Sequence, residues 1–237
     1  GPVPEGLAPG LRRALLALPA APPGPAELLS AVEARAWRDF APRADAVRRD
    51  AFGEDVFVRA IVEFSNVCRQ DCLYCGLRRG NAKLERYRMS RSEIVEAVGR
   101  LAADGIRTAV LQSGDDLSYS AEEVCAVVAE IKARFPGTAV TLSIGERPDG
   151  EYEAFRRAGA DRFLIKHETA VPALYARFHP GQSHGRRMEI LRRLRALGYQ
   201  TGTGFIVGLP GQTAADIVED LSFIGSFKPE MAGIGPF

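Results

Sequence analysis

The feature that most constrains the fold of this chain is a repeated alternation between short apolar segments and longer segments with helical spacing. Apolar, β-branched runs are typical of buried strands, and each of the first five runs precedes a segment of helical spacing. Strands that alternate with helices predict a parallel sheet with right-handed crossovers. The predicted strands comprise residues 56–64, 108–111, 139–144, 162–165, 204–207 and 231–234.

Signals at the helix ends support this pattern. Ser90 with Glu93, and Ser120 with Glu123, fit the capping box that begins a helix. Three glycines occupy positions expected just after a helix, namely Gly105, Gly159 and Gly198. Six strands in this pattern fit either a partial or complete (β/α) barrel or a doubly wound open sheet.

The first 55 residues differ in composition from the rest of the chain. They are rich in Ala, Arg, Leu and Pro, and prolines interrupt their helical spacing. We interpret residues 1–55 as an N-terminal helical cap and residues 56–237 as the strand–helix domain. The chain ends directly after the last predicted strand, so we expect it to be a fragment of a longer fold.

Polar clusters follow the predicted strands at the point where each strand ends. The loops after the carboxyl ends of parallel strands form the active face of barrels and of open α/β sheets. These clusters therefore predict a functional site on that face. They comprise residues 68–75, 112–116, 145–146, 167–169 and 208–213.

Three of the four cysteines, Cys68, Cys72 and Cys75, lie within eight residues in the sequence C-R-Q-D-C-L-Y-C. Thiolates are the soft ligands that iron–sulfur clusters take, and three of them leave one iron of a cubane without a protein ligand. Two alternatives remain open on spacing alone: zinc with a fourth ligand, and a CxxC redox pair. We expect Cys125, in a predicted helix among valines, to be an inert thiol.

Composition excludes several classes of partner. The net charge is only +1, which gives no expectation of binding to nucleic acid or to an anionic membrane. No apolar run approaches the roughly 20 residues that a membrane-spanning helix needs, and no secretory signal pattern is present. Clustered thiols in such a chain favour a reducing, cytoplasmic location.

The C-x-x-x-C-x-x-C motif after the first predicted strand resembles the signature of radical S-adenosylmethionine (SAM) enzymes. The wider stretch E-F-S-N-V-C-R-Q-D-C-L-Y-C-G-L-R-R-G-N is similar to HydE, the FeFe-hydrogenase maturase family, and to its relatives biotin synthase and methylornithine synthase. Further segments similar to HydE follow in the expected order: R-Y-R-M-S, V-L-Q-S-G-D-D, V-T-L-S-I-G-E, K-H-E-T-A, V-G-L-P-G-Q-T and G-I-G-P-F.

This resemblance implies a TIM-type (β/α) barrel, truncated here after strand six, with a 4Fe-4S cluster on the three cysteines. SAM would chelate the open iron and be cleaved to methionine and a 5′-deoxyadenosyl species. In the HydE family this chemistry acts on an organometallic precursor of the hydrogenase H-cluster. The implied partners are a small-molecule or organometallic substrate, an electron donor such as a ferredoxin or flavodoxin, and other hydrogenase maturases.

The resemblance also implies contacts to SAM near the cysteines. Gln112, Ser113 and Gly114 match the motif that meets the methionyl end of SAM. Asp115 stands where the family usually has Glu. Tyr74, between two of the cysteines, resembles the aromatic residue whose backbone meets adenine.

Further along the chain, Glu168 and Arg186 resemble residues that hold the ribose and carboxylate region of SAM. Lys166 stands where HydE more often has Arg, and lysine lacks the bidentate fork of arginine. Thr141 and Ser143 match positions that line the substrate cavity. The structural alternatives are an ion pair between Glu168 and Arg186, and ordinary filling of the barrel by Thr141 and Ser143.

Three function classes follow from these observations. The first is a HydE-like radical SAM enzyme, and the second is a methylornithine-synthase-like or biotin-synthase-like activity with the same cofactors. The third is a zinc-stabilised module without catalysis. We interpret Gly208–Gly211 as a contact for adenosine, because a phosphate-binding Walker motif would need a following Lys-Ser or Lys-Thr pair. We interpret His179 and His184 as surface histidines.

Overall fold

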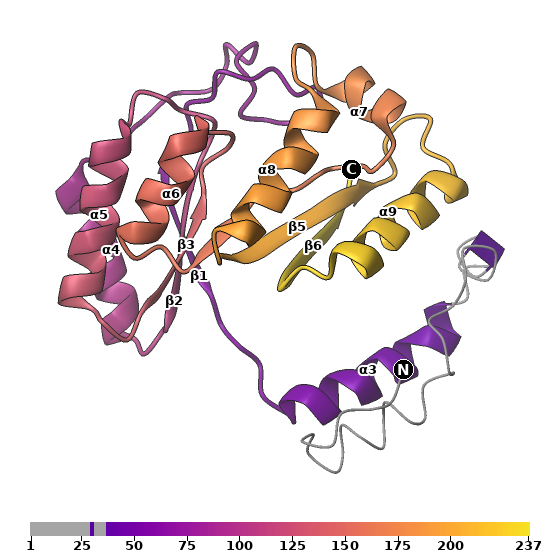
Figure 1. Cartoon of the computed structure of the whole chain (residues 1–237), viewed down its shortest axis with the longest axis horizontal. Helices are drawn as coiled ribbons and strands as arrows, with labels where there is room; N and C mark the ends of the chain where they lie inside the picture. The colour runs from indigo at the N-terminus through magenta and orange to yellow at the C-terminus, as the bar shows by residue number, and fades with distance from the viewer. Residues whose placement is uncertain (1–28, 31–36) are drawn as a thin grey trace. The chain divides into compact units, whose positions relative to one another are not determined.

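The computed structural model describes residues 29–30 and 37–237. Its centre is a sheet of six parallel strands whose order in space is their order in the chain (Figure 1). Each strand pairs in parallel with the next one. The strands are β1 (Ala60–Ser65), β2 (Thr108–Ser113), β3 (Ala139–Ser143), β4 (Arg162–Leu164), β5 (Gln200–Val207) and β6 (Met231–Pro236).

Helices connect these strands, as the sequence predicts. A doubly wound sheet reverses its strand order at a switch point, whereas this order runs from β1 to β6 without reversal. The connectivity is therefore that of a (β/α) barrel. The connecting helices are α4 (Arg91–Ala103), α5 (Ala121–Arg134), α6 (Asp149–Arg157), α7 (Pro172–Phe178), α8 (His184–Ala196) and α9 (Ala214–Phe227).

The core lies between the sheet and the helices α4, α5, α6 and α8. Alternate strand residues, such as Val140 and Leu142, point into this layer and are fully buried. Val98 of α4 and Val128 of α5 contribute buried side chains to the same cluster. Each such burial stabilises the fold by about 1.5–3 kcal/mol.

The predicted helix ends are confirmed. Ser90 and Glu93 form a capping box at the start of α4, and Ser120 and Glu123 form one at the start of α5. In each box, the serine hydroxyl and the glutamate carboxylate accept hydrogen bonds from the other's backbone N–H. The three glycines predicted after helices all have positive φ: Gly105, Gly159 and Gly198.

Two strand starts differ from the prediction, and five of the six strand ends shift by one or two residues. Strand β1 begins at Ala60, so residues 56–59 precede it, and β5 begins at Gln200, four residues before its predicted start. The first half of β5 lacks an apolar pattern because buried threonines stand there. Thr201 Oγ1 donates to Tyr199 O at 3.2 Å, and Thr203 Oγ1 lies 2.9 Å from His167 Nδ1, which allows these polar side chains to be buried.

Helix α3 (Trp37–Phe52) belongs to a compact unit separate from the sheet. Within it, Asp45 pairs with Arg48 at 3.1 Å and with Arg49 at 2.8 Å. The rest of the predicted helical cap, residues 1–28 and 31–36, lies outside the described residues. In the part of the chain that the structure describes, every helix is too short or too polar to cross a membrane.

Candidate functional site

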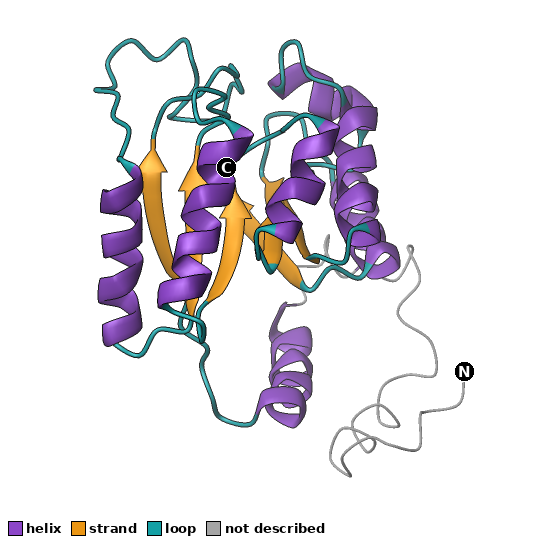
Figure 2. Ribbon diagram, turned by 60° about the vertical axis from the view of Figure 1, so that its left-hand side comes forward, coloured by secondary structure: helices purple, strands orange, loops and turns teal. Residues whose placement is uncertain are grey.

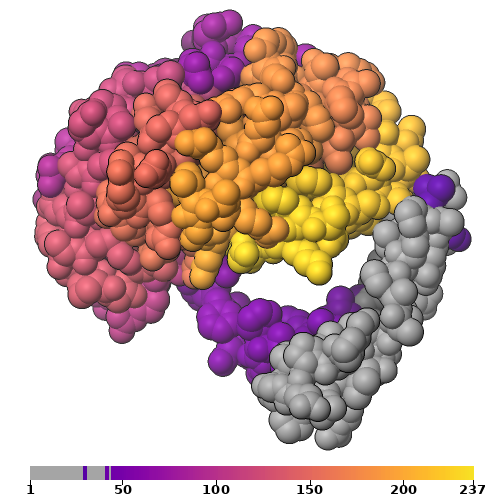
Figure 3. All heavy atoms as spheres, in the orientation of Figure 1, coloured from indigo at the N-terminus to yellow at the C-terminus, as the bar shows by residue number. Residues whose placement is uncertain are grey.

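The loops that follow the carboxyl ends of the strands meet at one end of the sheet, above the arrow tips in Figure 2. The segment of residues 66–90, here called the cysteine loop, follows β1 and carries Cys68, Cys72 and Cys75. It lies beside the residues of α7 at the upper edge in Figure 3. Leu73 N–H donates to Phe178 O at 2.9 Å, which joins the cysteine loop to the end of α7.

Asp115, after β2, holds the beginning of the cysteine loop. Its carboxylate accepts from Arg69 Nε and from Gln70 Nε2, both at 2.8 Å, and its carbonyl accepts from Arg69 N–H at 2.9 Å. Its own N–H donates to Cys68 Sγ at 3.3 Å. A Cβ on Gly114 would lie 2.2 Å from Val67 O, so only glycine allows this close approach.

Arg86 holds the remainder of the cysteine loop. Its guanidinium donates to the carbonyl oxygens of Asn66 at 2.5 Å, Leu77 at 2.9 Å and Arg78 at 2.8 Å. These carbonyls lie on both sides of the three cysteines in the chain, so one side chain ties the two ends of the ligand segment together. Arg86 leaves no signal in the sequence, because an arginine in a polar loop belongs to no periodic pattern.

The turn after α7 contacts the middle of the cysteine loop. Gln182 Nε2 donates to Cys72 Sγ at 3.1 Å, and the Tyr74 hydroxyl lies 2.9 Å from His179 Nε2. His179 Nδ1 lies 2.8 Å from the carbonyl of Tyr175, which can only accept, so Nδ1 carries the proton and Nε2 accepts from Tyr74.

The prediction that His179 is a surface histidine is wrong, because its side chain is only 1% exposed. Burial lowers its pKa to about 4, so it is neutral at pH 7 and can serve as the acceptor for Tyr74. The His179 ring stacks on the ring of Tyr175 in α7, at a centroid distance of 3.8 Å. His184 is half-buried against the ring of Tyr175, at a centroid distance of 5.4 Å.

Two of the clustered thiols are perturbed by their surroundings. Burial raises the pKa of the Cys68 thiol, partly offset by the backbone N–H of Asp115. Burial also raises the pKa of the Cys72 thiol, partly offset by Gln182. Ligation by metal requires thiolates, so loading this site releases protons and is favoured by higher pH. Cys125 lies on α5, packed against the helix–sheet core as expected.

The arrangement of the thiols bears on the kind of metal centre. Within the described ranges, no three His, Cys, Asp or Glu side chains converge on a point that would suit a single metal ion. A cubane cluster has a different requirement, because each thiolate binds a separate iron at a separate corner. The donor set of three thiols on one clamped loop fits such a cluster.

The inner face of the sheet carries polar side chains beside the cysteine loop. Gln112 Nε2 donates to Glu63 Oε1 at 2.9 Å, and Gln112 is paired in register with Ser143 on β3. Ser113 Oγ donates to Gly114 O at 2.7 Å. Thr141 is buried, and its Oγ1 has no hydrogen-bond partner among the residues that the structure describes.

Glu168 follows β4 with a strained backbone. Its φ is 64°, a left-handed conformation that is uncommon for a residue with a side chain and is concentrated at functional sites. Its N–H donates to Gly204 O at 3.0 Å, and Ile206 N–H donates to its carbonyl at 3.0 Å, which fixes the strained residue against β5. Glu168 Oε2 forms an ion pair with Lys166 Nζ at 3.2 Å. Among the residues that the structure describes, no group donates a hydrogen bond to this buried oxygen.

The structure brings Arg187, rather than the predicted Arg186, to this face. Arg187 is 7% exposed, and it donates to Glu146 Oε1 at 2.7 Å, to Lys166 O at 2.5 Å and to Gln182 Oε1 at 3.3 Å. Burial works against its charged form, but Tyr175 and Glu146 outweigh this effect and raise its pKa. It is therefore a cation at every ordinary pH.

Arg186 points away from this face, towards the surface. It pairs there with Asp149, at the start of α6, and with Glu189 of α8. Helical periodicity contains the signal that distinguishes the two arginines. Ile190 and Leu191 are buried, and Arg187 precedes them by three and four residues, so it shares their inward face. The predicted ion pair between Glu168 and Arg186 is accordingly not formed.

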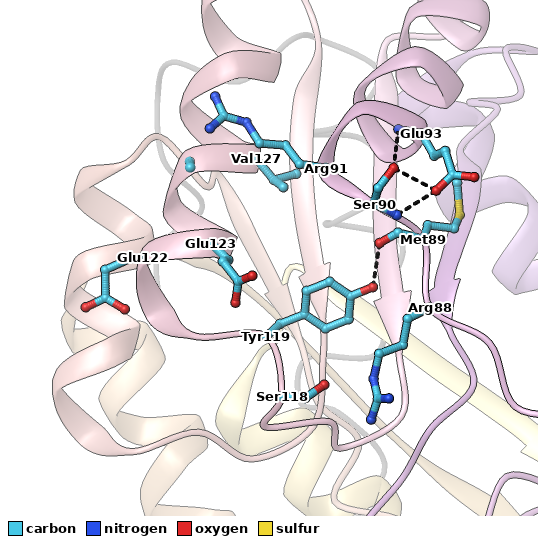
Figure 4. A pocket seen from close by; sticks show the side chains of 11 residues that line it. Arg88, Met89, Ser90, Arg91, Glu93, Ser118, Tyr119, Glu122, Glu123 and Val127 are labelled. Atoms are coloured by element: carbon cyan, nitrogen blue, oxygen red, sulfur yellow. Dashed lines mark hydrogen bonds between the residues drawn. The ribbon is translucent and has the colours of Figure 1, made fainter.

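A groove of about 780 Å³ lies between the beginnings of α4 and α5, and its lining includes Arg88, Glu123 and Val127 (Figure 4). Tyr119 projects into it and donates from its hydroxyl to Met89 O at 2.7 Å. None of the three clustered cysteines lines this groove. It is therefore separate from the candidate site.

Comparison with known proteins identifies the family. The sequence-family model of the radical SAM superfamily matches residues 62–224. This range includes the cysteine loop and the strand ends described above. The chain belongs to the radical SAM superfamily. Enzymes of this superfamily use a 4Fe-4S cluster and SAM, which agrees with the thiol donor set of the cysteine loop.

Several characterised members resemble this radical SAM chain. It is 51% identical over 194 residues to the [FeFe] hydrogenase maturase subunit HydE of Thermotoga maritima, an alignment that covers 82% of the chain and 55% of HydE. It is 29% identical over 196 residues to 3-methylornithine synthase of Methanosarcina acetivorans, covering 82% of the chain and 55% of that protein. The chain thus spans about half the length of the curated relatives it matches.

The solved structures support the radical SAM fold. The crystal structure of methylornithine synthase superposes with a TM-score of 0.87 at 22% identity, covering 96% of this chain and 67% of that protein. The hydrogenase maturase HydG superposes with a TM-score of 0.78 at 19% identity, covering 96% and 53%. The predicted TIM-type barrel architecture is confirmed.

Proposed function

We propose that this chain forms the cluster- and SAM-binding part of a HydE-like radical SAM enzyme that acts in assembly of the FeFe-hydrogenase H-cluster. The observation that carries the proposal is the clamping of the cysteine loop to the loop after β2 and to the turn after α7, where Asp115 and Gln182 donate to cysteine sulfurs. The 51% identity to HydE, against 29% for methylornithine synthase, supports the HydE-like activity.

In this proposal, Cys68, Cys72 and Cys75 hold the 4Fe-4S cluster. When bound, the cluster supplies the electron that cleaves the sulfonium of SAM. The chain's own part is to keep three thiolates on one rigid segment and to stabilise their charge. Asp115 N–H does so at Cys68, and the Gln182 amide does so at Cys72.

Arg187 and Glu168 supply the polar anchors for SAM. Arg187 is a buried cation fixed by Glu146, which suits a carboxylate ligand, and it replaces Arg186 in this role. Glu168 presents a buried oxygen without a hydrogen bond, which suits a ribose hydroxyl. Lys166 Nζ lies 3.2 Å from that carboxylate and forms an ion pair with it.

The remaining contacts follow from the strand ends. The methionyl end of SAM contacts Gln112, Ser113 and Gly114. The backbone at Tyr74 contacts adenine, and the hydrogen bond to His179 holds the ring of Tyr74 in place. Thr141 and Ser143 face the substrate, and the unpartnered hydroxyl of Thr141 is available to it. These two residues extend the proposed site from SAM to the substrate.

The proposed partners match this chemistry. The substrate is a small organometallic molecule, the electron donor is a protein such as a ferredoxin or flavodoxin, and other hydrogenase maturases receive the product. Reduced thiols are required to hold the cluster, so the location is the cytoplasm. A methylornithine-synthase-like or biotin-synthase-like activity shares the cofactors and would differ only in its substrate.

The test compares two neighbouring arginines in anaerobically reconstituted protein. Arg187→Lys should weaken SAM binding by roughly ten- to a hundredfold, since a charge-assisted hydrogen bond contributes roughly 1.5–3 kcal/mol. Arg186→Lys, which alters only surface pairs, is the matched control. Calorimetric SAM titration and detection of 5′-deoxyadenosine after reduction provide the readouts. Wild-type protein that carries the cluster but neither binds nor cleaves SAM would refute the proposal.

A further inference from the structure

The side chain of Gln182 lies between a buried cation and a cysteine sulfur. Arg187 donates to Gln182 Oε1 at 3.3 Å, and Gln182 Nε2 donates to Cys72 Sγ at 3.1 Å. An arginine can only donate, so the carbonyl end of the amide must face Arg187. The NH₂ end must therefore face Cys72, and the orientation of the amide follows from its partners.

Arg187 is itself held in place by two further acceptors. It donates to Glu146 Oε1, after β3, at 2.7 Å and to the carbonyl of Lys166, after β4. Because Arg187 is buried, it has little freedom to release Gln182. The result is a continuous series of hydrogen bonds from Glu146 through Arg187 and Gln182 to Cys72. Hydrogen bonds in series polarise one another, which strengthens the last donor.

From this geometry we infer that Gln182 is a positioning residue that raises the reduction potential of the cluster bound at Cys72. The inference rests on the proposed function, because it requires the cluster. Reduction adds negative charge to the cluster and its sulfur ligands. A donor aimed at one of those sulfurs stabilises the reduced form more than the oxidised form.

Cys68 provides a useful contrast within the same site. Its sulfur accepts from the backbone N–H of Asp115 at 3.3 Å, which a side-chain substitution leaves in place. The donor to Cys72 comes instead from a side chain on the turn between α7 and α8. The potential can therefore be changed at Gln182 without altering a ligand.

The test uses two substitutions at Gln182 and one control. Gln182→Leu removes the donor. Gln182→Glu keeps the size and the pairing with Arg187, but its carboxylate accepts rather than donates. Gln200→Leu removes another amide, at the start of β5, where its oxygen accepts from Arg162 at 2.6 Å. Each protein is reconstituted anaerobically, its iron is counted, and its midpoint potential is measured by redox titration monitored by electron paramagnetic resonance.

Both Gln182 variants should shift the midpoint to lower potential. At a fixed solution potential near the midpoint, the ratio of reduced to oxidised cluster should fall by roughly tenfold, as expected for one charge-assisted hydrogen bond. Gln200→Leu should match the wild type. Equal potentials in loaded wild type, Gln182→Leu and Gln182→Glu would overturn the inference while leaving the proposed function intact.

The iron content of each protein distinguishes failure of the proposed function from failure of the inference about Gln182. A wild-type protein that takes up no iron would refute the proposed function itself. If Gln182→Leu alone loses the cluster, the potential of Gln182→Glu decides the inference. If both variants lose it while Gln200→Leu retains it, Gln182 serves assembly rather than potential, and the inference is wrong.

Discussion

The helix–sheet layer and the cysteine loop are stabilised in different ways. In the layer, side chains such as Leu142 are completely removed from solvent and make apolar contacts. In the cysteine loop, Leu73 is 49% exposed, and the backbone is held by hydrogen bonds from Arg86 to its carbonyls and from Arg69 N–H to the carbonyl of Asp115. Apolar packing thus fixes the scaffold, and polar side chains that bond backbone groups fix the segment that carries the cysteines.

This difference predicts different responses to substitution. Loss of a core side chain leaves a cavity and lowers the stability of the whole domain. Loss of a polar clamp releases a local segment, which opens with its own, smaller free energy. The loop can therefore fail as a ligand platform while the scaffold remains folded.

The largest effect is expected in the layer. Phe163 of β4 is fully buried, with ring centroids 5.3 Å from Tyr152 and 5.9 Å from Tyr199. Phe163→Ala should lower the free energy of unfolding by about 3–5 kcal/mol, because it creates a large cavity. Urea denaturation measures this change. Leu73→Ala, at an exposed position, is the control, and equal losses in the two variants would contradict the contrast.

A smaller, local effect is expected at Arg86. Arg86→Lys removes the fork that bonds carbonyls on both sides of the cysteines, and it should lower the stability of the loop by about 1.5–3 kcal/mol. Amide hydrogen exchange should accelerate across residues 66–81 and stay unchanged in α5. Arg79→Lys is the matched control in the same loop. Uniform acceleration throughout the domain would show that the clamp is part of the global core.

The smallest effect concerns Asp116, which accepts from Arg88 Nε at 2.7 Å and from Ser65 Oγ at 2.8 Å. Burial alone would raise its pKa, but hydrogen bonds from Arg88, Ser118 and Ser65 outweigh burial and lower the pKa from 3.8 to about 2. Because the folded-state pKa is depressed, the stabilisation is complete above about pH 4 and is lost as the pH falls towards 2.

This linkage gives a testable pH dependence. Between pH 4 and pH 2, protonation of Asp116 should cost roughly 1–2 kcal/mol of stability. Urea denaturation of wild type and Asp116→Asn at several pH values measures it. The variant should be less stable at pH 5, and its stability should fall less steeply below pH 4. Parallel curves for the two proteins would assign the acid sensitivity to other groups.

The sequence predicts the scaffold well because apolar packing stabilises it, and apolar packing requires side chains at periodic positions in the sequence. Alternating apolar residues locate the strands, and the capping boxes at Ser90 and Ser120 locate two helices. The main error in strand length, at the start of β5, arises where Thr201 and Thr203 are buried through hydrogen bonds that no pattern reveals.

The site was predictable only in part. The cysteine spacing identifies the ligand segment, and the polar clusters after strands identify the face on which it lies. The clamps at Arg86, Asp115 and Gln182 join residues up to 110 positions apart, so local patterns do not contain them. Helical periodicity could have predicted the burial of Arg187, since its spacing from Leu191 places it on the buried face of α8.

The central claim is that the clamped cysteine loop binds an iron–sulfur cluster. The most direct measurement is the iron content and visible spectrum of anaerobically reconstituted wild type, Cys72→Ala and Cys125→Ala. Wild type and Cys125→Ala should each be brown with about four irons per chain, and Cys72→Ala should lose the cluster. Stoichiometric zinc without iron in the wild type, or equal iron in all three proteins, would contradict the account.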